Sequence, residues 1–262
     1  MAFYFKSLCS SSSGNCLVLW TDRTRVMIDC GLSSMRRTRQ MLTENLGNPR
    51  DVDAVIISHA HSDHISYYPL RVLEEYGHKV RIHESCIEQL KEKHFNGYGF
   101  GSLKLKPFGS RKFTVGDMVF EPFEVPHNPY YPTYGFVVEH EGTRSVIATD
   151  FNRWEGAMGY FADAAFIFVE SNHDIELLRL HFNPNSEFHM SNPETSRLLC
   201  TVRRESQKPP KTVMLGHISS QRNKPAIAIK EVGAAFRRQG LRADFELCTA
   251  PLYECSKTVR IR

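Results

Sequence analysis

Four side chains of types that bind metal ions lie within six residues, in the segment Ser58-His59-Ala60-His61-Ser62-Asp63-His64. The segment follows an apolar run, residues 52–57, that is short and rich in β-branched side chains and therefore indicates a buried strand. Imidazoles at the end of a buried strand lose water and need a partner, and a bound cation is a partner for all of them at once. The alternative is a polar turn that happens to be rich in histidine, which this spacing disfavours.

The spacing of these ligands indicates two metal ions. His59 and His61 are two residues apart and can point to the same side, where they would bind one cation. Asp63 and His64 are adjacent and must point apart, so this pair is expected to bind a second, neighbouring cation. Two cations roughly 3.5–4 Å apart would polarise a substrate oxygen and hold a hydroxide between them.

Other predicted strands also end in a residue that could bind a metal or carry a proton. These strand ends are Asp29, the His59 segment, His127, Asp150, Glu170 and His217. Each alone could be a capping or loop residue, but together they indicate one site at an edge where strand ends converge. The alternation of strands and helices, without an internal repeat, predicts an α/β protein.

A two-metal site needs about seven protein ligands, and the strand ends supply them. The first metal is expected to be bound by His59, His61 and His127, and the second by Asp63, His64 and His217. Asp150 can bridge both cations because a carboxylate has two oxygens, and Asp29 is expected to orient a ligating imidazole by accepting its other N–H. Nitrogen and oxygen ligands suit Zn²⁺, Mn²⁺ or Fe²⁺, and the sequence does not decide among them.

The elements that position these residues follow from periodicity and capping signals. A β-hairpin with a loop over residues 9–16 is expected at the start of the chain. Residues 95–109, rich in glycine and aromatic side chains, are expected to form a loop over one face. A helix is expected from Pro193, with Asn192 as its N-cap.

The order His59-x-His61-x-Asp63-His64, then His127, Asp150 and His217, resembles the metallo-β-lactamase superfamily, and Asp29 matches its first motif. The resemblance extends over essentially the whole chain. It implies a four-layer αββα sandwich with a di-metal site at its edge, and it is closest to the hydrolase branches. True β-lactamases usually have cysteine in place of Asp150, and flavodiiron proteins replace a histidine of the cluster, so both are disfavoured.

Further segments resemble the YycJ/WalJ group of this superfamily, small bacterial and phage proteins regarded as 5′-to-3′ DNA exonucleases. The segments are residues 8–15 (LCSSSSGN), 170–174 (ESNHD), 189–192 (HMSN) and 215–219 (LGHIS). This chain departs from the group at Ser11, Phe188 and Met190, none of which is a predicted ligand. His217 follows Asp150 by only 67 residues, too few for the additional domain of β-CASP nucleases, so a single domain over residues 1–262 is expected.

The resemblance implies that the substrate is nucleic acid, DNA with a free 5′ end, and several polar side chains are candidates to contact it. Ser12, Ser13 and Asn15 lie in the predicted hairpin loop, which either directs backbone N–H groups at a phosphate or is a plain turn. His173 and His189 are expected to contact substrate phosphate or to donate a proton, the alternative being ordinary loop histidines.

The mechanism expected from this site is attack of a metal-bridged hydroxide on a phosphodiester phosphorus, in line with the leaving oxygen. Asp63 and Asp150 are expected to orient the hydroxide, and His189 to protonate the leaving group. A thioester hydrolase of the glyoxalase II type and a phosphodiesterase for small molecules would use the same ligands. A non-catalytic binding protein on this scaffold would normally have lost ligands.

Composition and charge exclude several classes of protein. The chain has 262 residues and is 41% hydrophobic, which is enough for a core and argues against disorder. No apolar stretch approaches the roughly 20 residues of a membrane span, and the apolar start is too short for a signal peptide. Seven cysteines without a Cys-x-x-Cys pair favour reduced thiols in a cytoplasmic enzyme. A net charge of +4 permits a nucleic-acid substrate without requiring one.

Overall fold

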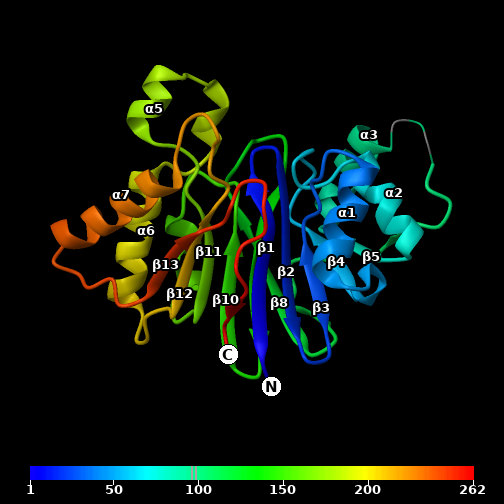
Figure 1. The fold of residues 1–262 in the computed structure, drawn as a ribbon, viewed down its shortest axis with the longest axis horizontal. Helices are drawn as coiled ribbons and strands as arrows, with labels where there is room; N and C mark the ends of the chain where they lie inside the picture. Colours follow the sequence, from blue (N-terminus) through cyan, green and yellow to red (C-terminus); the bar gives the residue numbers. More distant parts are fainter. Residues whose placement is uncertain (96, 98) are drawn as a thin grey trace.

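Two mixed β-sheets pack face to face, and helices cover the outer face of each, in a computed structural model that describes residues 1–95, 97 and 99–262 (Figure 1). Helices α1 to α3 lie on one outer side and α5 to α7 on the other (Figure 1). The predicted four-layer αββα sandwich is confirmed. Within the described residues, no helix is both long enough and apolar enough to cross a membrane.

The first sheet has the strand order β14-β1-β2-β3-β4-β5-β6. Its strands are β1 (Phe3–Ser11), β2 (Gly14–Thr21), β3 (Arg25–Ile28), β4 (Ala54–Ile57), β5 (Lys79–Ile82), β6 (Lys104–Leu105) and β14 (Val259–Arg260). From β3 to β6 the pairing is parallel. The connections contain α1 (Met35–Leu46), η1 (Pro49–Asp51), α2 (Tyr67–Tyr76), η2 (Glu84–Cys86) and α3 (Ile87–His94).

The second sheet has the order β13-β12-β11-β10-β9-β8-β7 and is parallel from β10 to β13. Its strands are β7 (Phe113–Val115), β8 (Met118–Val125), β9 (Thr133–His140), β10 (Thr143–Ala148), β11 (Phe166–Glu170), β12 (Thr212–Gly216) and β13 (Glu246–Thr249). Its helices are η3 (Glu155–Ala157), α4 (Met158–Phe161), α5 (Ile175–Leu180), η4 (Pro184–Phe188), α6 (Asn192–Glu205) and α7 (Pro225–Arg238).

Aromatic side chains fill the space between the two sheets. The ring of Phe5, in β1, lies 4.6 Å from that of Phe166 and 5.3 Å from that of Phe168, both in β11. All three are fully buried, and burial of each contributes roughly 1.5–3 kcal/mol relative to exposure. This core holds the two sheets in a fixed relation, so residues at the ends of strands from different sheets can form one rigid site.

Two predicted details of the elements are wrong, and a third lies partly outside the described residues. The predicted hairpin loop over residues 9–16 is wrong, because β1 and β2 continue pairing through it and leave only Ser12 and Ser13 as the turn. Asn192 is the first residue of α6, not its cap; the cap is Ser191, whose hydroxyl accepts the N–H of Glu194. The predicted loop over 95–109 includes residues 96 and 98, which lie outside the described residues, and its described part contains β6.

Candidate metal centre

The loop after β4 carries four of the predicted ligands, and backbone hydrogen bonds hold it against neighbouring segments. The N–H of Asn15 donates to the carbonyl of Asp63 (2.8 Å), and that of Cys30 donates to the carbonyl of His64 (2.8 Å). Gly31 lies against the same loop so closely that a Cβ there would stand 1.7 Å from the Asp63 carbonyl oxygen. The position of the ligand loop therefore depends on a residue without a side chain.

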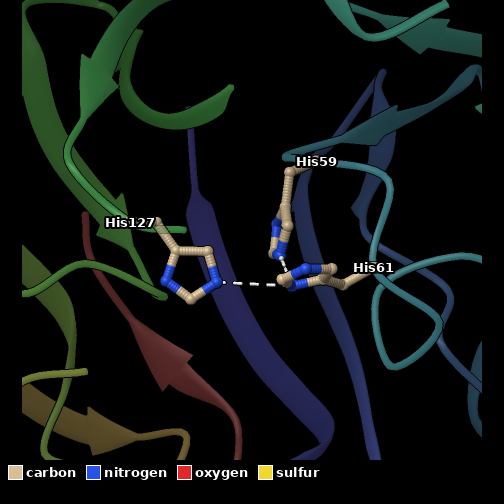
Figure 2. Close-up of side chains that lie close together, drawn as sticks. All are labelled: His59, His61 and His127. Carbon is tan, nitrogen blue, oxygen red and sulfur yellow. Dashed lines mark hydrogen bonds between the residues drawn. The ribbon is translucent and has the colours of Figure 1, made fainter. Parts of the chain in front are cut away.

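The first predicted ligand trio is brought together at the edge of the sandwich (Figure 2). His59 Nε2 lies 2.9 Å from His61 Nδ1, which lies 3.3 Å from His127 Nε2. Two nitrogens bound to one tetrahedral Zn²⁺ at 2.0–2.1 Å stand about 3.3 Å apart. The three nitrogens thus fit a single cation.

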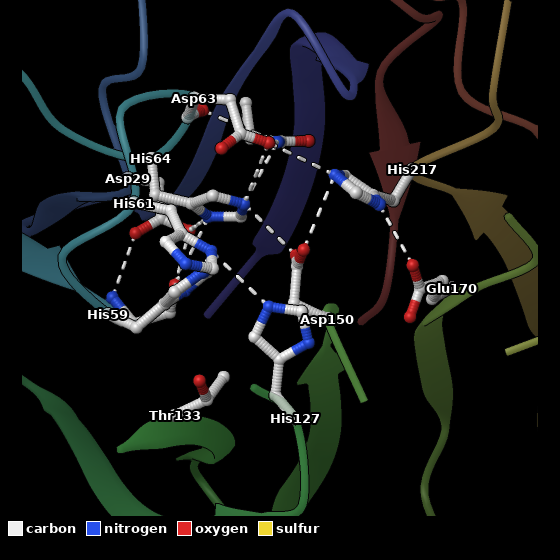
Figure 3. Close-up of polar contacts among 12 residues, drawn as sticks. Asp29, His59, His61, Asp63, His64, His127, Thr133, Asp150, Glu170 and His217 are labelled. Atoms are coloured by element: carbon white, nitrogen blue, oxygen red, sulfur yellow. Dashed lines mark hydrogen bonds and ion pairs between the residues drawn. The ribbon is translucent and has the colours of Figure 1, made fainter. Parts of the chain in front are cut away.

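The second predicted group forms beside the first (Figure 3). His217 Nε2 lies 3.3 Å from Asp63 Oδ2 and 3.5 Å from Asp150 Oδ1. His64 Nε2 lies 3.0 Å from Asp150 Oδ2 and 3.5 Å from Asp63 Oδ2. Two imidazoles and two carboxylates converge here, a set that suits a divalent cation of borderline softness.

Asp150 lies where a bridge between the two groups would be needed. The rings of His59, from the first group, and His64, from the second, are only 4.2 Å apart. Asp150 is almost fully buried, yet no described residue donates an aligned hydrogen bond to its Oδ2. His64 Nε2, at 3.0 Å, is its near polar neighbour, and a bound cation between the two atoms would satisfy both. The residues present therefore fit a divalent metal pair.

Three residues of the site have a positive φ angle, a backbone conformation that residues other than glycine rarely adopt. The φ angles of Asp29, Asp150 and His217 are 60°, 59° and 49°. Asp29 and His217 directly follow β3 and β12, and Asp150 lies two residues after the end of β10. Such a conformation costs of the order of 1–3 kcal/mol and persists only where the surrounding structure requires it. Backbone strain is thus found at residues of the candidate site in both sheets.

Asp29 makes the contact that the sequence predicts for it. Its Oδ2 lies 2.7 Å from His64 Nδ1, and its Oδ1 accepts the N–H of Ser58 at 2.8 Å. The hydroxyl of Ser58 adds a further hydrogen bond to Oδ2 (2.9 Å). With its Nδ1 proton held in this way, His64 presents Nε2 to the metal site.

Glu170 has the same relation to His217, a role that the sequence analysis missed. Its Oε1 accepts from His217 Nδ1 at 2.8 Å and from His189 Nδ1 at 2.6 Å, and its side chain is fully buried. The signals in the sequence were its place at a strand end and in the segment 170–174 that resembles the YycJ/WalJ group. Partners of ligands are common in metal sites, but sequence spacing does not say which carboxylate meets which imidazole.

The charges of the site favour cation binding. Burial lowers the pKa of His61 to about 3, and the nearby His127 lowers it further. The His61 ring is therefore neutral and offers a lone pair. Burial also disfavours a charge on His217, but Asp150 and the hydrogen bonds with Asp63 and Glu170 outweigh it and raise its pKa to about 10. The second group therefore carries enough negative charge to stabilise a cation strongly.

The two groups open into a hollow of about 240 Å³, here called the central hollow. His61, Asp63 and His217 line it, together with His189 and Ser12. The sequence-predicted proton donor, His189, thus faces the same space as the ligands. Its Nδ1 is 3.6 Å from Asp150 Oδ1, which also places it near the metal groups.

Two of the predicted substrate contacts are buried in the structure and stay predictions. Asn15 is 1% exposed, and its Nδ2 contacts His64 Nε2 (3.1 Å) and Asp63, so it holds the ligand loop in place. His173 is 5% exposed and does not line the central hollow. Ser12 and Ser13, by contrast, form the exposed turn between β1 and β2, where a substrate can reach them.

The comparisons with known proteins agree with this fold and site. A family model described as the beta-lactamase superfamily domain matches residues 24–218. The chain belongs to this superfamily. Exodeoxyribonuclease WalJ of Streptococcus pneumoniae serotype 2 is 30% identical over 236 residues, which cover 85% of this chain and 84% of that protein. Exodeoxyribonuclease YycJ of Bacillus anthracis is 27% identical over 267 residues, covering 92% and 91%.

Solved structures show the same fold. The metallo-β-lactamase fold protein YhfI of Bacillus subtilis superposes with a TM-score of 0.75 at 16% identity, over 99% of this chain and 100% of that one. A diphosphatase of the PhnP family superposes with a TM-score of 0.69 at 15% identity, over 99% and 98%. The predicted resemblance to the superfamily and to the YycJ/WalJ group is confirmed, and the chain is a hydrolase of the metallo-β-lactamase fold, which implies divalent metal ions.

Proposed function

We propose that this hydrolase is an exonuclease that removes nucleotides from DNA with a free 5′ end. One observation carries the proposal: two adjacent groups of predicted ligands open into the central hollow. His189, which is not one of the predicted ligands, lines the same hollow. The two relatives named exodeoxyribonucleases, similar over most of their length, support DNA as the substrate.

In this proposal two divalent cations, Zn²⁺ or Mn²⁺, are bound by the seven residues predicted from the sequence. Those residues are His59, His61 and His127 for one cation and Asp63, His64 and His217 for the other, with Asp150 between them. When bound, such a pair supplies Lewis-acid stabilisation of phosphoryl oxygens and activates water at neutral pH. Asp63 and Asp150 then orient the attacking water.

His189 is the residue proposed to protonate the leaving oxygen. Its Nδ1 is held by Glu170 Oε1 at 2.6 Å, so Nε2 is the nitrogen available to the substrate. As a general acid, His189 would act from Nε2 by giving a proton to the leaving alkoxide. Glu170 also fixes the ring orientation, which a general acid needs.

Arg222 and Ser12 are proposed to contact the terminal phosphate of the DNA. Both line the central hollow. The Nε of Arg222 is shielded from solvent and finds no hydrogen-bond partner in the described part of the chain. A guanidinium is charged at any physiological pH, and phosphate oxygens are its best partners.

The proposal is tested with purified protein supplied with Mn²⁺ or Zn²⁺. Linear DNA bearing a 5′-phosphate should be degraded to nucleotides, and closed circular DNA should persist because it offers no end. The same preparation is given RNA, a small phosphodiester and a glutathione thioester, which represent the competing hydrolase classes. His61→Ala, purified in parallel, controls for contaminating nuclease because it removes a predicted ligand from the exposed side of the site.

The outcomes separate the candidates. Degradation of linear DNA by the wild type and not by His61→Ala supports the exonuclease. Cleavage of the glutathione thioester without attack on DNA or RNA would refute the proposal in favour of a thioester hydrolase. Equal activity in His61→Ala would assign the nuclease to a contaminant.

A further inference from the structure

Two further hollows continue from the central hollow around the Ser12–Ser13 turn. The second hollow, of about 530 Å³, shares Ser12 and Asp63 with the central one. The third, of about 230 Å³, shares Ser13 and Ser33 with the second. Neighbouring hollows share lining residues and therefore lie next to one another around the turn; together they are here called the turn groove.

The lining of the turn groove is rich in groups that bind phosphate. Serine hydroxyls line it at five positions, Ser12, Ser13, Ser33, Ser62 and Ser66, beside apolar side chains such as Leu32 and Met41. It also contains two cations, Lys93 in the second hollow and Arg37 in the third. Lys93 lies over the ring of Tyr131 and donates to its hydroxyl, and Arg37 donates to the backbone carbonyl of Tyr253. Among the described residues, no carboxylate forms an ion pair with either cation.

Each of the two outer hollows also has one exposed tyrosine at its wall. Tyr68, in the second hollow, is 51% exposed, and Tyr253, in the third, is 52% exposed. Each of them lines the same hollow as a cation, Tyr68 with Lys93 and Tyr253 with Arg37. Aromatic rings spaced along a cationic groove are the usual platform on which unpaired bases stack.

We infer that the turn groove binds a single-stranded nucleic acid that leads to the metal centre, with phosphates on the serines, Lys93 and Arg37, and bases on Tyr68 and Tyr253. The inference rests on the proposed nuclease function and names the form of its substrate. Bases stack on protein side chains only when they are not stacked within a duplex, so the segment in the groove is unpaired. A blunt duplex must fray to enter it.

The test measures equilibrium binding, which does not depend on turnover. A single-stranded oligonucleotide of 12 nucleotides, linked by phosphorothioates and labelled at its 3′ end, is titrated with the protein as isolated, and its fluorescence anisotropy is recorded. Tyr68→Ala and Tyr253→Ala should each weaken binding by about 5- to 150-fold, the range for loss of one stacked base. Lys93→Gln should lower the slope of log affinity against log salt by about 0.7, the value for one phosphate contact.

Matched controls separate the groove from general effects of charge and folding. Lys112→Gln removes an exposed lysine that forms an ion pair with Glu121 and lines none of the three hollows, so it should leave affinity and salt slope unchanged. A blunt duplex of the same sequence should bind more weakly than the single strand, and the tyrosine variants should affect it less. Thermal unfolding verifies that each variant is folded.

The failure of this inference can be told from the failure of the proposed function. If the wild type hydrolyses bis(p-nitrophenyl) phosphate and linear DNA but all groove variants bind the single strand like the wild type, the groove inference alone is wrong. The same holds if the variants weaken duplex and single strand equally. If the wild type hydrolyses neither phosphodiester, the proposed function is wrong, and the groove inference falls with it.

Discussion

Replacement of Gly31 by alanine should displace the ligand loop and thereby remove one of the two proposed metals. A Cβ at this position would stand 1.7 Å from the carbonyl oxygen of Asp63, 2.0 Å from its carbonyl carbon and 2.5 Å from the backbone nitrogen of His64. All three are backbone atoms, so no side-chain rotation can relieve the clash. The loop and the glycine must separate by about 1.5 Å or more to restore ordinary van der Waals contact.

The expected magnitude follows from this displacement. Overpacking of this kind costs about 1–3 kcal/mol, and the two backbone hydrogen bonds that hold the loop, from Asn15 and Cys30, contribute about 0.5–1.5 kcal/mol each. A loss of about 2–6 kcal/mol lowers the melting temperature by roughly 4–24 °C in a chain of this size. Because Asp63 and His64 are the residues displaced, the second metal should be lost before the first, and hydrolysis should fall by at least about 100-fold.

The assay combines metal content, by mass spectrometry of freshly purified protein, with thermal unfolding in the presence and absence of a chelator. Gly159→Ala is the matched control, since it makes the same chemical change in a helix where an added Cβ meets no atom within 4 Å. Gly31→Ala protein with wild-type metal content and melting temperature would refute the reasoning, because the close approach of the loop would then not determine ligand geometry.

Three other predictions concern single side chains. Wild-type protein should contain about two metals per chain, and Asp150→Ala should lose most of both; one tightly held metal that this substitution leaves in place would contradict the dinuclear site. His189→Ala should keep its metal while hydrolysis falls by about 10²–10⁴-fold, as for loss of a general acid, whereas loss of metal would make His189 a ligand. Burial raises the pKa of the Cys9 thiol to about 12 and those of Cys86 and Cys248 to about 11. Native protein at pH 8 should therefore react slowly with 5,5′-dithiobis(2-nitrobenzoic acid) and rapidly once denatured, and equal rates would show that these thiols are not protected.

The fold class, and the residues that meet in the candidate metal site, could be predicted from the sequence because both depend on local patterns. His59, His61, Asp63 and His64 lie within one loop, so their chemistry is visible as spacing. The more distant ligands, His127, Asp150 and His217, were found because each follows an apolar run that reads as a strand. Parallel strands end at the same edge of a sheet, so position at a strand end was enough to bring these residues into one predicted site.

What only the tertiary structure decided was which side chains meet and which are shielded from solvent. Glu170 and His217 are 47 residues apart, and their contact exists because β11 and β12 are neighbours in register. Asn15 has a polar side chain in a predicted loop, which suits substrate binding. Pairing of β1 with β2 nevertheless buries it against the ligand loop. Burial and distance depend on how the layers pack, and a one-dimensional pattern contains neither, whereas the identity of a metal ligand depends on side-chain chemistry, which the sequence states directly.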